Sequence, residues 1–66
     1  MPDSDQALTE VLVDALEDQA RAMTTMELSL ETMRPYPDVL DELHALEVLG
    51  IVVRQSKGRD TLWLLG

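Results

Sequence analysis

Gly50 divides the chain into two segments with different hydrophobic patterns. Before it, apolar residues recur every three or four positions, which is the spacing of amphipathic helices. After it comes Ile51-Val52-Val53, a β-branched run that is typical of a strand. Because glycine is common just after the last turn of a helix, this pattern predicts an α+β fold in which helices come first and strands follow.

Three helices are predicted before Gly50, over residues 4–23, 25–33 and 38–49. Asp3 or Ser4 can cap the first helix, and Thr24 and Glu27 have the spacing of a capping box for the second. The run Arg34-Pro35-Tyr36-Pro37 separates the second helix from the third, because the residue before each proline is disfavoured in the helical region. Pro37 then starts the third helix.

The second helix is predicted to bury Leu28 or Leu30 together with Met33. Three methionines surround it, at Met23, Met26 and Met33. Methionine fills irregular spaces in a core or forms an adaptable binding surface. We expect these methionines to fill the core.

Two strands are predicted after Gly50, over residues 51–55 and 60–65, with a turn between them. A lone hairpin is unstable in water, so one of its faces must pack on the helices. Trp63 points to one face, and its neighbours Leu62 and Leu64 point to the other. Since both faces are apolar, the second face favours a homodimer.

Composition limits the class of protein. A chain of 66 residues predicts one domain, 1–66, and the absence of cysteine excludes a disulfide framework. No apolar run approaches the length of a membrane span, and the acidic start is unlike a signal peptide, so a cytoplasmic protein is expected. With a single histidine, His44, and no nucleophile motif or phosphate loop, the sequence predicts neither an enzyme nor a cofactor or metal site.

Glu27-Leu28-Ser29, followed by Leu43-x-x-Leu46-x-x-x-Gly50-Ile51-Val52, resembles the winged helix-turn-helix domain of the MarR, ArsR and PadR regulator groups. The resemblance implies a winged helix, with three helices and a C-terminal two-stranded hairpin as the wing. It also implies a DNA-binding transcriptional regulator whose third helix enters the major groove.

DNA contacts are then expected from the turn before the third helix and from the wing. The candidate residues are Arg34, Tyr36, Arg54, Lys57 and Arg59. The net charge of −8 is unevenly distributed along the chain. Residues 1–50 contain twelve acidic and two basic residues, a charge of −10. Residues 51–66 contain one acidic and three basic residues, a charge of +2. The hairpin is therefore the part of the chain that favours contact with a polyanion.

The outward face of the third helix predicts a different partner. It is expected to carry Asp38, Asp41, Glu42, Ala45 and Val48. Because DNA affinity depends on neutralising phosphates, three carboxylates at this place oppose DNA binding. The alternative hypothesis is a winged-helix protein–protein interaction module whose acidic third helix binds a protein.

Overall fold

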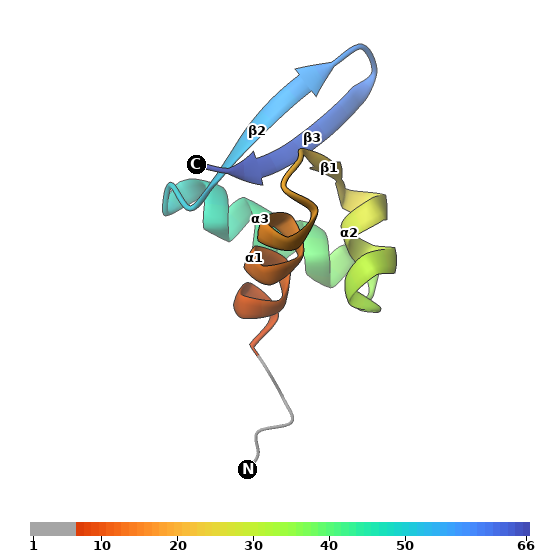
Figure 1. The fold of residues 1–66 in the computed structure, drawn as a ribbon, viewed down its shortest axis with the longest axis vertical. Helices are drawn as coiled ribbons and strands as arrows, with labels where there is room; N and C mark the ends of the chain where they lie inside the picture. The colour runs from red at the N-terminus through yellow and green to blue at the C-terminus, as the bar shows by residue number, and fades with distance from the viewer. Residues whose placement is uncertain (1–6) are drawn as a thin grey trace.

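The computed structural model of the chain describes residues 7–66, which form three helices and a three-stranded antiparallel sheet (Figure 1). In chain order the elements are α1 (Leu8–Gln19), β1 (Met23–Thr24), α2 (Thr25–Thr32), α3 (Tyr36–Val48), β2 (Val52–Lys57) and β3 (Asp60–Leu65). The predicted α+β class is confirmed. The expected cap at Asp3 or Ser4 lies outside the described residues.

A short strand, β1, replaces the predicted last turn of the first helix. Helix α1 ends at Gln19, and Ala20 adopts a left-handed backbone with a φ of 54°. Met23 then pairs with Trp63, and Thr24 pairs with Leu62. The predicted helix 4–23 is therefore too long, and the sheet has three strands rather than two. Hydrogen bonding along β3 holds Met23 in an extended backbone while its side chain is still buried.

Helix α2 begins at the predicted capping box. The Thr24 hydroxyl oxygen accepts from the backbone N–H of Glu27 at 3.1 Å, and the Glu27 carboxylate accepts from the backbone N–H of Thr24 at 2.9 Å. The buried side of α2 is narrower than predicted. Leu28 is fully buried, whereas Leu30 is 71% exposed and Met33 is 88% exposed.

Helix α3 begins at Tyr36, two residues before its predicted start, with Pro35 as the N-cap. Pro37 lies in the first turn, where no helical partner exists for the N–H that proline lacks. At the other end, the N–H of Gly50 donates to Glu47 at 3.0 Å and that of Ile51 donates to Leu46 at 2.9 Å. With a φ of 80° at Gly50, this is a Schellman motif. The predicted stop at Gly50 is confirmed.

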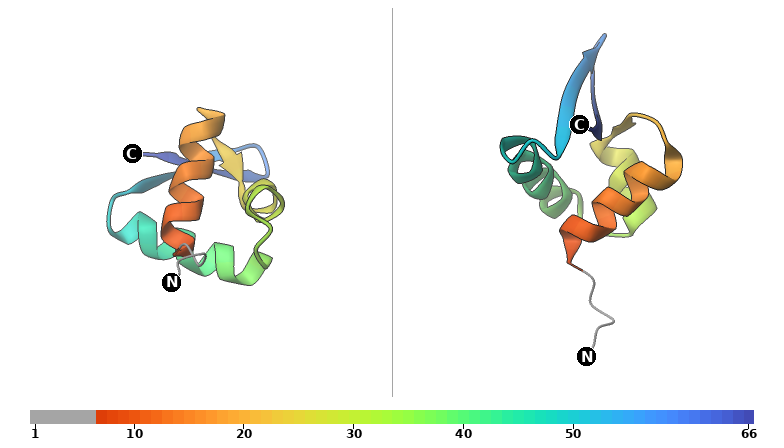
Figure 2. Two further views of the ribbon diagram at one scale, coloured as in Figure 1. Left: turned by 60° about the horizontal axis from the view of Figure 1, so that its bottom comes forward. Right: turned by 60° about the vertical axis from the view of Figure 1, so that its left-hand side comes forward.

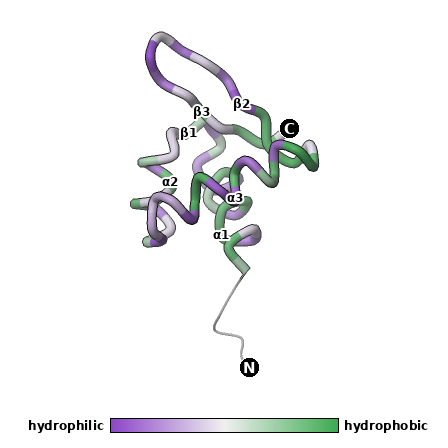
Figure 3. Tube along the Cα trace, turned by 180° about the vertical axis from the view of Figure 1, so that it is seen from behind, coloured by the Kyte–Doolittle hydropathy of each residue, from purple (hydrophilic) through white to green (hydrophobic). Residues whose placement is uncertain are grey.

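The sheet has the strand order β1-β3-β2. Strand β2 begins at Val52 rather than the predicted Ile51 and continues to Lys57, which pairs with Asp60. Gly58 turns the chain with a φ of 63°. The β2–β3 hairpin stands above the helices in the right-hand view of Figure 2, and Figure 3 shows that its tip is hydrophilic.

The core lies between the three helices and the inner face of the sheet. Its largest fully buried side chains are Trp63, Leu12, Met23, Leu28, Leu43, Leu46, Val39 and Val52. The Trp63 indole N–H donates to the Thr25 hydroxyl at 2.9 Å, and the ring of His44 lies 5.8 Å from the Trp63 ring. No helix within residues 7–66 has both the length and the apolar character needed to cross a membrane.

Candidate functional site

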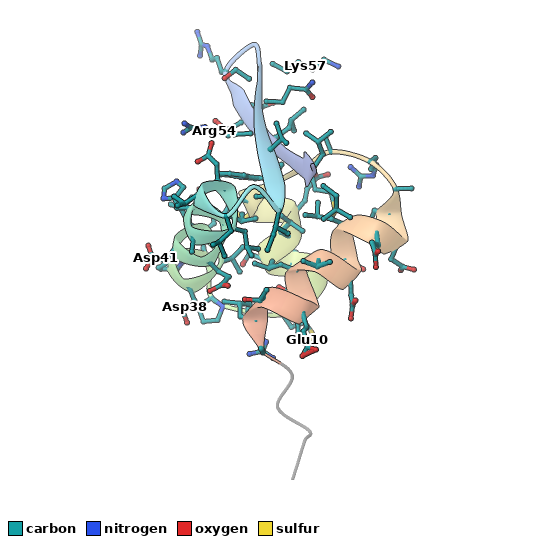
Figure 4. All side chains as sticks on the ribbon, turned by 90° about the vertical axis from the view of Figure 1, so that its left-hand side faces the viewer. Glu10, Asp38, Asp41, Arg54 and Lys57 are labelled. Carbon is teal, nitrogen blue, oxygen red and sulfur yellow. The ribbon has the colours of Figure 1, made fainter. Side chains whose placement is uncertain are left out.

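The outward face of α3 is acidic at its N-terminal half and apolar at its C-terminal half. Asp38, Asp41, Ala45 and Val48 are all exposed, and their spacing of three, four and three residues places them on one side of the helix. Figure 4 shows Asp38 and Asp41 pointing outward, away from the hairpin. Val48 is 86% exposed.

The prediction that Glu42 lies on this outward face is wrong. It is half-buried, and its carboxylate accepts a hydrogen bond from the hydroxyl of Thr9 on α1. The packing of α1 against α3 brings this hydroxyl within reach of Glu42, a contact between residues 33 positions apart. The outward face of α3 therefore presents two carboxylates, Asp38 and Asp41, rather than three.

Arg54 is held against α3. It lies opposite Trp63 in the β2–β3 register, so both side chains are on the face of the sheet that packs on the helices. Its guanidinium Nε is 3.2 Å from a carboxylate oxygen of Glu47. This ion pair offsets the positive charge of Arg54, so less of that charge is available to a polyanion.

Lys57 and Arg59 are the neighbours of Gly58 at the turn of the hairpin, and both are exposed. Figure 4 shows Lys57 near the tip. Arg59 lines a shallow pocket of about 410 Å³ together with Tyr36, which is 44% exposed. The remaining lining residues are Thr24, Thr25, Met26, Asp60 and Thr61. The structure thus brings together Tyr36 and Arg59, two candidates from distant parts of the sequence.

Arg34 lies in the turn between α2 and α3 and does not line the Tyr36–Arg59 pocket. Its backbone N–H donates to the carbonyl of Ser29 at 3.2 Å, and its carbonyl accepts from the Ser29 hydroxyl at 2.7 Å. These bonds fix the turn. The structure therefore gives the backbone of Arg34 a local structural role.

The capping box lowers the pKa of the Glu27 carboxyl group. The hydrogen bond from the Thr24 backbone N–H holds the pKa of Glu27 below its usual value, and burial partly opposes this. Arg21, 3.5 Å away, adds a smaller lowering effect. Among residues 7–66, no three His, Asp or Glu side chains come together to hold a metal ion.

An apolar stripe on the solvent side of α2 was not predicted. Met26 is 57% exposed, Leu30 71% and Met33 88%, so the expectation of core filling is wrong for Met26 and Met33 and holds for Met23. Met26 and Leu30, at i and i+4, lie on one face of α2, and Met33 is the C-cap residue that follows the helix. This spacing is visible in the sequence, but Leu28 on the opposite side competes with it as the core residue.

An acidic groove of about 520 Å³ lies between α1 and α2. Its lining residues are Val11, Asp14, Ala15, Glu17, Asp18, Glu31 and Thr32. Four of the seven carry carboxylates, so the groove has a strongly negative potential.

Comparison with models of known protein families and with curated protein sequences gives no match for this chain.

Proposed function

We propose that this chain is a winged-helix domain that binds a protein partner through the outward face of α3. The three-residue turn Met33–Pro35 between α2 and α3 supports a helix-turn-helix arrangement. The β2–β3 hairpin extends beyond the helices in the manner of a wing (Figure 1). These features support the winged-helix assignment, and the chemistry of α3 supports the choice of partner.

The charge of α3 carries this proposal. Within the described residues 7–66, Asp38 and Asp41 form no ion pair, and both are exposed. In a DNA groove they would face phosphates with no cation to compensate. Ala45 and Val48 continue the same face as an apolar surface. An apolar patch next to charged side chains is compatible with a protein interface, which combines apolar and polar surface, and the two carboxylates favour a basic partner.

A second candidate function, a DNA-binding regulator, is favoured by the Tyr36–Arg59 pocket. The phenol of Tyr36 and the guanidinium of Arg59 could hold a phosphate. Lys57 pairs with Asp60, which lines the same pocket. In this case the β2–β3 hairpin and the start of α3 would contact the DNA. The pairing of Arg54 with Glu47 reduces the cationic charge that is available for it.

Affinity capture with matched variants tests the protein-binding function. The α3 variant carries Asp41→Asn and Val48→Ser. The control carries Glu10→Gln and Ile51→Ser, which are the same kinds of change at exposed side chains outside α3. We expect a basic protein to be retained by the wild type and the control and lost by the α3 variant. If only the control variant fails to retain the basic protein, binding through α3 is contradicted. Trp63 fluorescence confirms that each variant is folded.

A titration with duplex DNA at several salt concentrations separates the two functions. We expect no binding even at low salt, where attraction to phosphate is strongest. Binding whose salt slope falls by about one unit per lost phosphate contact in a Lys57→Ala, Arg59→Ala variant would instead identify the DNA-binding regulator. The titration is interpreted only in buffers where the chain is folded.

We also propose that a second copy covers the outer face of the sheet. Val53 and Leu64 lie opposite each other on this face, and Val53 is 47% exposed. Leu64 borders a groove of about 390 Å³ that is also lined by Ala20 and Ala22. Sedimentation velocity checks this arrangement, and a monomer at high micromolar concentration contradicts it.

A further inference from the structure

Strand β2 lies at an open edge of the sheet. Within residues 7–66 the strand order β1-β3-β2 places it beside β3 alone. All of its residues after Val52 are exposed, and the hairpin rises above the helices in the right-hand view of Figure 2. One side of β2 therefore faces solvent.

The hydrogen bonds of the hairpin identify the backbone groups on this open side. The Gly66 N–H donates to the carbonyl of Ile51 at 3.0 Å, which continues the antiparallel β2–β3 register by one pair. Hydrogen-bonded and non-hydrogen-bonded pairs alternate along such a ladder. Every second residue after Ile51 therefore bonds to β3, and the N–H and C=O groups of Arg54 and Ser56 point to the opposite side.

A strand of another chain is the ligand that these backbone groups fit. A row of unpaired N–H and C=O groups is a template for a further strand. In such an addition, main-chain hydrogen bonds supply affinity and alternate side chains supply specificity. We expect the added strand to run antiparallel to β2, because antiparallel pairing is slightly more stable per residue than parallel pairing.

The charge at the turn determines the kind of strand. Lys57 and Arg59 are exposed and form no ion pair with any residue that the structure describes. Asp60 faces Lys57 in the register, yet residues 51–66 keep a net charge of +2. At the other end of β2, Val53 is 47% exposed. The edge is thus cationic beside the turn and apolar beside α3.

We infer that β2 adds an extended strand of a partner protein that has carboxylates beside the turn and apolar side chains beside Val53. In an antiparallel arrangement the acidic residues come first in that strand. A second β2 strand fits less well, because it brings the same lysine and arginine to the edge and like charges on adjacent strands disfavour pairing. The site differs from the outward face of α3 and from the outer face of the sheet, since backbone groups form it.

The test uses a labelled synthetic peptide with glutamates in its N-terminal half and alternating valine and threonine in its C-terminal half. A control peptide has the same sequence, but two adjacent central residues are N-methylated. It keeps every side chain and charge and loses an N–H on each edge of the extended chain. Fluorescence anisotropy measures binding to the whole protein at several salt concentrations. We expect the first peptide to bind and the N-methylated peptide to show no binding.

Two matched pairs of variants locate the contact. Ser56→Pro should weaken binding of the glutamate peptide about tenfold, because it removes an N–H on the open edge and no bond of the β2–β3 ladder. Ser56→Thr keeps this N–H and should bind like the wild type. Lys57→Gln should reduce the salt dependence of binding. Arg34→Gln makes the same change of charge in the turn before α3 and should not.

Trp63 fluorescence during thermal unfolding shows whether each variant is folded, and the N-methylated peptide tests the same hydrogen bonds without any change to the protein. Equal binding of the two peptides, or equal binding to wild type and folded Ser56→Pro, overturns the proposal, since the attraction would then come from charge alone. A dimer in sedimentation that Ser56→Pro converts to a monomer overturns it in favour of a second copy. Asp41→Asn changes the outward face of α3 and should leave peptide binding unchanged, so the two proposals fail separately.

Discussion

The indole N–H of Trp63 donates a hydrogen bond of 2.9 Å to the hydroxyl oxygen of Thr25, across 38 positions of sequence. Both side chains are buried, with exposed fractions of 1% for Trp63 and 6% for Thr25. The bond therefore joins the last strand to the first turn of α2 in a place that water does not reach. It also satisfies the single polar atom of the largest core side chain.

Replacement of Thr25 by valine should destabilise the fold by about 1–3 kcal/mol, because the indole N–H would be left buried without an acceptor. Thr25→Ser keeps the oxygen and should be milder. Urea unfolding followed by Trp63 fluorescence measures both variants. Equal stabilities for the valine and serine variants would show that the hydrogen bond contributes nothing.

Truncation of Leu43 should unfold most of the protein. The side chain is fully buried, and Leu43→Ala should cost about 2–5 kcal/mol. A domain of this size has a total stability of only about 3–5 kcal/mol. The matched change Leu49→Ala, at a side chain 71% exposed, should alter stability by less than about 0.5 kcal/mol. Thermal melts by circular dichroism make the comparison, and similar melting of the two variants would contradict the assignment of Leu43 to the core.

The end of α1 contains a strained alanine that glycine should relieve. Ala20 has a φ of 54°, a left-handed conformation that residues with a Cβ atom disfavour. Ala20→Gly should therefore stabilise the protein by about 0.5–1 kcal/mol. The same change within a helix, Ala45→Gly, should destabilise it by about 1 kcal/mol. Opposite signs in chemical denaturation are the expected result, and destabilisation at both positions would argue against a left-handed Ala20.

Glu27 should make the fold sensitive to acid. Its pKa is lower in the folded chain than in the unfolded chain, chiefly because its carboxylate accepts from the backbone N–H of Thr24. Its contribution is thus fully present above the ordinary pKa of glutamate in the unfolded chain and is lost as the pH falls through the lower folded pKa. Glu27→Gln retains an acceptor for the capping box but does not titrate. The difference in stability between wild type and Glu27→Gln should therefore depend on pH below that value, and a constant difference would contradict the lowered pKa.

Local signals in the sequence determined the order of helices and strands and several of their ends. The capping box at Thr24 and Glu27, the prolines before α3 and the glycine at position 50 all act through backbone dihedrals and hydrogen bonds within a few residues. Such preferences operate without knowledge of distant partners. This explains why the predicted boundaries of α2 and the stop after α3 agree closely with the structure.

The tertiary structure alone decided which residues face one another. Strand β1 exists because Met23 pairs with Trp63, and Arg54 faces α3 because Glu47 lies within 3.2 Å of it. Helix α2 carries apolar residues on two sides, and only its packing against α1 and α3 determined that Leu28 is buried while Leu30 is exposed. These outcomes depend on contacts between residues far apart in the chain, and hydrophobic periodicity carries no information about which of two apolar sides will find a partner.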